Sequence, residues 1–188
     1  MCGRYTGYID DCDEMKTIYT IAESAWPKTV FQSGEIYPTN TVPILVSTDQ
    51  AVRVVPGYWG FPGFKGSSVM INARSETVDQ RPTFADSFRW CRCVVPTTGY
   101  FEWDRQKRKY LFNQPERKML FLAGLYKVAA EQVQFVILTT AANESVAGVH
   151  HRMPVILDSS ELYRWNTDRQ FAMTCINRKM PDLCRKEA

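Results

Sequence analysis

The chain has 188 residues, of which 45% are hydrophobic and 23% are charged, the balance of an ordinary globular protein with a substantial core. Its net charge of +3 is too small to indicate a nucleic-acid or membrane partner by itself, so a surface that binds a polyanion must gather its positive charge locally. No secretory leader is visible and no apolar run approaches the ~20 residues of a membrane span, so we expect an intracellular protein with no membrane partner.

The first four residues, Met1-Cys2-Gly3-Arg4, place a cysteine directly after the initiator methionine. Removal of Met1 would give Cys2 a free α-amine, with a reference pKa of about 7.7–8.0, beside a thiol of about 8.5. Such an aminothiol attacks an aldehyde twice, because the amine forms an imine and the sulfur then closes a five-membered thiazolidine. The second step is intramolecular and therefore favoured. Alone, the Met-Cys pair is weak evidence for this chemistry.

Local patterns predict the elements of the first half of the chain. Apolar residues at helical spacing favour a short helix, and β-branched runs favour strands. In chain order we expect a helix over Glu14–Ala22, an extended edge segment over 36–43, a hairpin of 44–48 and 52–55 joined by 48–51, an aromatic loop over 58–64, and an extended stretch over 72–77. The aromatic loop either caps the core or offers bases a stacking platform.

The second half is richer in strands. We expect a helix over 84–90 capped by Thr83, strands over 93–96, 99–103, 119–126, 133–140 and 155–157, a solvated basic hairpin tip at 105–109, and one helical turn within 141–148. Asp158-Ser159-Ser160-Glu161 has the form of a capping box and begins a helix through about Trp165. The last ~10 residues resemble a basic, frayed tail.

These elements predict one α+β domain over residues 1–188, a strand-rich mixed sheet curled into a barrel with a few short helices. We expect a monomer. Because nothing indicates an oxidising compartment and Cys91-Arg-Cys93 lacks zinc-knuckle spacing, we expect reduced thiols, no metal and no organic cofactor. The six cysteines are Cys2, Cys12, Cys91, Cys93, Cys175 and Cys184.

Four candidate catalytic residues lie in Gly-, Pro- or aromatic-rich surroundings. Cys2 offers the two nucleophiles, and Asn72 can donate to an alkoxide or hold an amine. Glu102 lies between two aromatic residues, where desolvation raises a carboxyl pKa towards neutrality, as a proton shuttle needs. His150 titrates near pH 7 without any shift. Taken one at a time, each of these residues is more often structural than catalytic.

Three arginines lie near these residues. Arg4 follows Cys2 on a predicted strand, and Arg74 and Arg152 each stand two residues after a candidate catalytic residue. A guanidinium in such a place can clamp a phosphate with two hydrogen bonds.

Several blocks together resemble one known family. They are Met1-Cys2-Gly3-Arg4, Trp59-Gly60, Asn72-Ala73-Arg74-Ser75-Glu76, Gly99-Tyr100-Phe101-Glu102-Trp103 and His150-His151-Arg152-Met153-Pro154. In this order, from residue 2 to about 157, they are similar to the signature of the SOS response-associated peptidase (SRAP) family, which processes abasic sites in DNA through a DNA–protein crosslink. The family pattern His-Asp-Arg-Met-Pro has His151 here in place of the acid. His150 fits the functional histidine, and an exchange of roles with His151 is the alternative.

The resemblance implies a mechanism and a partner. Single-stranded DNA with an abasic site, or a single-strand/duplex junction, would be the substrate, and the ring-opened aldehyde would be captured by Cys2 as a thiazolidine. By analogy, Glu102 and His150 would assist ring opening and proton transfer, and Asn72 would position the amine or a sugar hydroxyl. The phosphate clamps would be Arg4, Arg74 and Arg152, with Pro38 and Trp59 as an apolar shelf for bases.

Two other functions fit the same residues. The first is a cysteine peptidase with Cys2 as an N-terminal nucleophile, acting on its own Met1 or in trans. The second is a non-covalent reader of single-stranded or modified DNA.

Overall fold

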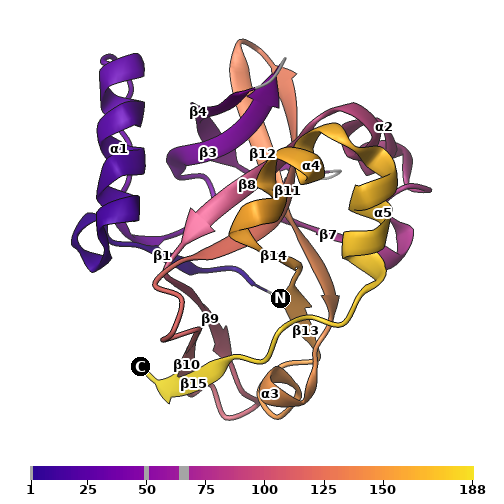
Figure 1. The fold of residues 1–188 in the computed structure, drawn as a ribbon. Coiled ribbons are helices and arrows are strands. Elements are labelled where there is room, and N and C mark those ends of the chain that lie inside the picture. The colour runs from indigo at the N-terminus through magenta and orange to yellow at the C-terminus, as the bar shows by residue number, and fades with distance from the viewer. Residues whose placement is uncertain (1, 49–50, 64–67) are drawn as a thin grey trace.

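The computed structural model describes residues 2–48, 51–63 and 68–188 (Figure 1). Its strands are β1 (Tyr5–Gly7), β2 (Gly34–Ile36), β3 (Thr41–Thr48), β4 (Ala51–Trp59), β5 (Phe61–Pro62), β6 (Val69–Met70), β7 (Asn72–Arg74), β8 (Arg92–Thr97), β9 (Gly99–Trp103), β10 (Lys109–Asn113), β11 (Leu120–Ala129), β12 (Gln132–Ala141), β13 (Arg152–Pro154), β14 (Ile156–Leu157) and β15 (Cys184–Glu187). The α-helices are α1 (Asp13–Ala25), α2 (Pro82–Trp90), α3 (Glu144–Ala147), α4 (Leu162–Thr167) and α5 (Arg169–Asn177).

Five strands close into a barrel in the order β4-β3-β8-β11-β12, since β12 pairs with β11 on one side and with β4 on the other. The β12–β4 and β12–β7 pairs are parallel and the other pairs of this sheet are antiparallel. The turn that joins β11 to β12 has Ala130 and Glu131 at φ of 49° and 61°, the positive values that a tight type I′ hairpin turn requires. The predicted α+β, barrel-like fold is confirmed.

A second sheet, in the order β15-β10-β9-β1-β2, packs at one end of the barrel. Strand β1 lies between β2 and β9 and pairs with both, so the residues before Tyr5 enter the molecule rather than trail from it (Figure 1). The backbone N–H of Phe101 also donates to the carbonyl of Arg4 at 2.9 Å. This pairing brings the N-terminal residues beside β9.

The barrel interior is filled by aromatic and aliphatic side chains. Strand β8 is buried along its whole length, and the ring of Trp59 stacks on Phe135 with their centroids 6.3 Å apart. The charged residue Arg92 is also buried: its guanidinium donates to the carbonyls of Phe88, Arg89, Trp165 and Asn166 at the ends of α2 and α4. Arg92 thereby satisfies carbonyls that the two helices leave without an internal partner.

The helices cover different sides of the barrel (Figure 1). The predicted first helix is confirmed and extends from Asp13 to Ala25, with Met15, Tyr19 and Ala22 facing inward. The predicted capping box at Asp158–Glu161 is present and precedes α4. Helix α2 begins at Pro82 after Arg81 rather than after Thr83, because a proline fits the first helical position, where no N–H partner is needed. In the described part of the chain, no helix is long and apolar enough to cross a membrane.

Two further expectations, for residues 36–43 and 58–64, differ from the structure. Residues 41–43 belong to β3 inside the barrel, where Pro43 faces Pro56 and the loss of N–H donors is confined to one rung of the β3–β4 ladder. The expected aromatic loop is largely strand, because β4 runs to Trp59 and Gly60, at φ 141°, turns the chain into β5. Phe64 and the turn residues 49–50 lie outside the described residues.

The expected frayed tail is ordered. Before β15, the side-chain amide of Asn143 donates to the carbonyls of Met180 and Pro181, and the Leu183 N–H donates to the hydroxyl of Ser145. Strand β15 then pairs with β10 over four residues. Strand β15 lies on the sheet edge with all four residues exposed, so its sequence is charged and shows no apolar alternation. For this reason the sequence does not predict a strand here.

Candidate active site

Cys2 lies just before β1 and is fully buried. Its carbonyl accepts a hydrogen bond from the Nδ2 amide of Asn72 at 3.0 Å, so β7 fixes the backbone of the N-terminal residue. Burial raises the pKa of the Cys2 thiol well above its usual range, and the nearby Glu102 carboxylate raises it further. The thiol therefore stays protonated until a base removes its proton.

Glu102 projects from β9 into the same region and is 3% exposed. Strand β9 is held on both sides, by β1 and by β10, where Tyr110 is the register partner of Glu102. Desolvation raises the pKa of the Glu102 carboxyl to about 7. At neutral pH this group is therefore present in both protonation states, and it can take up a proton and return it.

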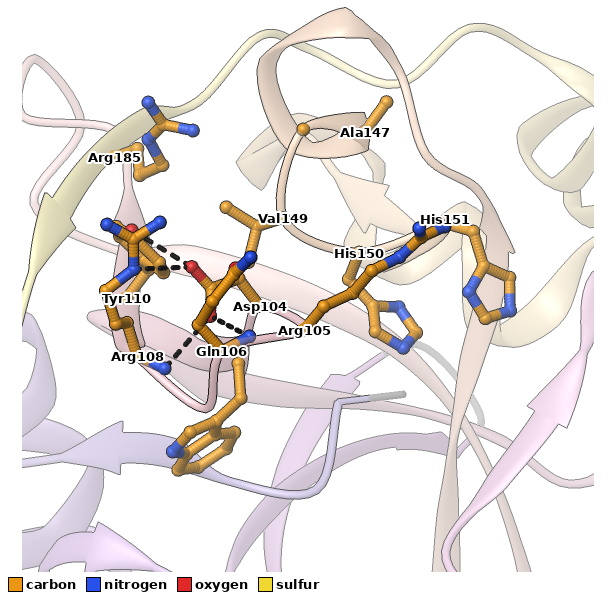
Figure 2. Close-up of a pocket in the computed structure, with 12 residues that line it drawn as sticks. Asp104, Arg105, Gln106, Arg108, Tyr110, Ala147, Val149, His150, His151 and Arg185 are labelled. Carbon is orange, nitrogen blue, oxygen red and sulfur yellow. Dashed lines mark hydrogen bonds and ion pairs between the residues drawn. The ribbon is translucent and has the colours of Figure 1, made fainter.

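His150 lies on the connection that follows α3 (Figure 2). Its Nδ1 is 3.9 Å from the Glu102 carboxylate. Its Nδ1 accepts the backbone N–H of Arg152 at 3.0 Å, which places the proton of the neutral ring on Nε2. Burial lowers the pKa of His150. His151 stacks on the neighbouring ring, with centroids 4.4 Å apart, and is exposed. Of the two histidines, His150 is the one beside Glu102.

Arg4 follows Cys2 and is held by several groups. Its guanidinium donates to Glu35 at 2.8 Å, and the same carboxylate accepts from Lys109 at 2.7 Å. The guanidinium also lies 3.8 Å from the ring centroid of Tyr37 and 5.3 Å from that of Trp103. Arg4 is thus oriented at the edge of the site while part of its side chain stays accessible.

The other two arginines differ from each other. Arg74 is exposed at the end of β7, and its side chain makes no hydrogen bond or ion pair with the residues that the structure describes. Arg152 is 7% exposed: both its terminal nitrogens bond the Glu76 carboxylate, at 2.5 and 2.8 Å, and one also donates to the Thr139 carbonyl. Arg152 is therefore held by partners inside the protein, and its role as a phosphate clamp stays a prediction.

The structure contradicts the part of the expected apolar shelf that Trp59 would form. Trp59 is fully buried and donates its indole N–H to the Ile71 carbonyl at 3.0 Å, so it is a core residue and offers no face to a base. Pro38 is half-buried in a tight turn between Tyr37 and Asn40, next to Thr39 at φ 72°. A β-branched residue at positive φ is strained, and such strain is typical of sites with a function.

Two acidic residues that the sequence analysis did not assign to the site hold its side chains in position. Glu35 orients Arg4, and Glu76 pairs with Arg152, whose backbone holds His150. Glu76 could have been found from the sequence, because it stands in the same block as Asn72 and Arg74. Glu35 could not, because its partners come from distant parts of the chain. Among the described residues, no group of His, Cys, Asp and Glu side chains is arranged to hold a metal ion.

Comparisons with known proteins agree with this geometry. The family model described as SOS response associated peptidase (SRAP) matches residues 1–182. The chain is 29% identical over 182 residues to the abasic site processing protein YoaM of Bacillus subtilis, covering 88% of this chain and 78% of that protein. It is 25% identical over 175 residues to the abasic site processing protein YedK of Escherichia coli, covering 88% and 79%.

In fold, the chain is similar to a crystal structure of a protein from Bacteroides thetaiotaomicron, with a TM-score of 0.78, 21% identity and coverage of 99% of this chain and 91% of that one. The family match over nearly the whole chain, on a fold that brings Cys2 to Glu102 and Asn72, shows that this protein belongs to the SOS response associated peptidase family.

Proposed function

We propose that this protein captures abasic sites in single-stranded DNA as a covalent thiazolidine through Cys2, after removal of Met1, and so shields the site from strand cleavage. The observation that carries the proposal is the convergence of Cys2, Asn72, Glu102 and His150, which come from four separate parts of the chain. The printed names of the relatives, which describe abasic site processing, support the choice of substrate.

The reaction begins with the ring-opened aldehyde of the abasic sugar. The Cys2 amine adds to C1′ and forms a carbinolamine, and loss of its hydroxyl as water gives an iminium. The sulfur then forms the C1′–S bond, the electron pair of the C=N bond returns to nitrogen, and the thiol proton leaves to a base. The net change is one aldehyde and one aminothiol to one thiazolidine and one water.

Glu102 fits both proton transfers because its pKa is raised to about 7. In the acid form it donates to the departing hydroxyl, and the carboxylate that results accepts the proton of the thiol. His150, with its proton on Nε2, assists opening of the cyclic hemiacetal. Asn72 fixes the backbone of Cys2 and thereby the position of the amine.

Closure by sulfur explains how the strand is shielded. An iminium at C1′ acidifies the hydrogens on C2′ and promotes β-elimination, which breaks the DNA strand. Addition of the thiol consumes the iminium and removes this driving force. Arg4 and Arg74, which remain accessible, are the proposed phosphate contacts, and Pro38 is the proposed apolar contact.

One gel separates this proposal from a peptidase, which the family description favours, and from a non-covalent reader. The protein is incubated with single-stranded DNA that carries one abasic site, and the mixture is then denatured. A shifted band that survives denaturation and disappears in Cys2→Ala supports crosslinking. A shift lost on denaturation supports the reader, and peptide cleavage without DNA dependence supports the peptidase.

A further inference from the structure

A cleft of about 730 Å³ opens beside His150, between the β9–β10 turn and the connection from α3 to β13 (Figure 2). Trp103, His150 and Arg185 of β15 are among the residues that line it. Trp103 also lies against the guanidinium of Arg4, so the cleft is continuous with the site described above.

Positive charge predominates in this cleft. Its charged lining residues are Arg105, Arg108 and Arg185 against one acid, Asp104. Asp104 is already bonded to Arg108 at 2.7 Å, so that pair contributes little net charge. The guanidinium groups of Arg105 and Arg185 form no hydrogen bond or ion pair with any residue that the structure describes, and both keep their donors for a ligand.

Arg185 is held in place although its charge is unpaired. Its guanidinium lies 5.3 Å from the ring centroid of Tyr110, and one terminal nitrogen approaches Gly148, where an added Cβ would stand 3.6 Å away. Gly148 ends the short helix that precedes His150. The C-terminal strand therefore brings a cation to the segment that carries the catalytic histidine.

Strand β15 lies beyond residue 182, the last residue that the family model matches. The cleft is therefore completed by a part of this chain outside the matched region. On β15, Arg185 pairs in register with Phe112, whereas the next residue, Lys186, pairs with Leu111 and points to the opposite face of the strand.

We propose that Arg105 and Arg185 form a phosphodiester subsite that holds the DNA strand on one side of the lesion as it leaves the active site. The subsite rests on the proposed function, since its ligand is the backbone of the same damaged strand. Guanidinium groups bind phosphate through charge-assisted hydrogen bonds without reading sequence, which suits a protein that must act on lesions in any context.

The test uses single-stranded oligonucleotides with a tetrahydrofuran abasic analogue, which lacks an aldehyde and so reports binding alone. Arg105→Ala/Arg185→Ala should weaken binding about three- to tenfold and reduce the slope of log affinity against log salt by about 1.4, since each single-strand phosphate contact contributes about 0.7. Lys186→Ala removes a neighbouring charge from the other face of β15 and should stay within about twofold of wild type. Arg185 also contacts Tyr110, so its replacement can disturb the packing of β15. The single variant Arg105→Ala changes only an exposed turn and leaves β15 intact.

A second series moves the lesion to one end of the oligonucleotide or the other. Removing the flanking nucleotides on one side should abolish the difference between wild type and the double variant, and removing those on the other side should preserve it. Wild-type binding by both arginine variants, or a loss that is the same for both truncations, would overturn the subsite. Failure of the proposed function would look different: the wild-type protein would form no denaturant-stable adduct with an aldehyde-bearing oligonucleotide.

Discussion

Replacement of Glu102 by glutamine should stabilise the folded protein at alkaline pH. Glu102 is 3% exposed and desolvation raises the pKa of its carboxyl from an ordinary 4.5 to about 7. Between these values the folded state holds a proton that the unfolded state has lost, so stability falls as pH rises through this window. Above pH 7 the wild-type protein must carry a buried carboxylate, and the pKa difference corresponds to about 3 kcal/mol.

Glutamine keeps the shape of the side chain without the charge. The free energy of unfolding of Glu102→Gln should therefore exceed that of wild type by less than about 1 kcal/mol at pH 5 and by about 3 kcal/mol at pH 8. For a chain of this length, about 3 kcal/mol corresponds to roughly 6–12 °C in Tm. Urea or thermal unfolding at the two pH values measures the difference.

A matched control is Glu116→Gln, which neutralises an exposed acid and should leave stability within about 0.5 kcal/mol of wild type. The reasoning would be refuted if Glu102→Gln were less stable than wild type at pH 8, or if the gap between them did not grow with pH. The same variant should form the crosslink more slowly, so that stability rises as activity falls.

Three further changes test other parts of the structure. Glu76→Gln should lower the free energy of unfolding by about 1–3 kcal/mol in urea titrations, because it leaves the buried guanidinium of Arg152 without its counter-charge. The loss is limited because Glu76 itself is half-exposed. A change below about 0.5 kcal/mol would show that this ion pair does not stabilise the fold. Arg92→Met should cost about 3 kcal/mol or more by the same assay, because four helix-end carbonyls lose their donors, and wild-type stability would contradict the capping role. Arg74→Ala should weaken binding to single-stranded DNA and reduce the salt slope by about 0.7, measured by fluorescence anisotropy; an unchanged slope would mean that Arg74 touches no phosphate.

Much of the fold follows from local patterns in the sequence. The β-branched and aromatic runs of β9, β11 and β12 and the capping box at Asp158 predict elements that the structure contains, because each depends on neighbouring residues alone. Helix α5 and strand β15 were missed. The position of β15 depends on β10, and its exposed, charged residues carry no apolar periodicity.

The candidate site likewise contains residues that the sequence predicts and residues whose state it does not predict. Asn72, Glu102 and His150 are polar residues in distinctive surroundings, and the structure brings each of them to the N-terminal segment or to one another. The state of Arg152 was not predictable, because an arginine that clamps a phosphate and one that pairs with Glu76 look identical in sequence. Trp59 posed the same problem, since its burial is decided by Phe135 and Tyr5, far away in the chain.

The most direct test of the central proposal is the intact mass of the protein after reaction with an oligonucleotide that carries one abasic site, measured under denaturing conditions without a reductant. The proposal predicts a species with the mass of the protein without Met1 plus the oligonucleotide minus one water, absent in Cys2→Ala. For Cys2→Ala, an adduct should appear only after borohydride treatment, which traps an imine. An unreduced, denaturant-stable adduct in Cys2→Ala, or none in the wild-type protein, would contradict the account.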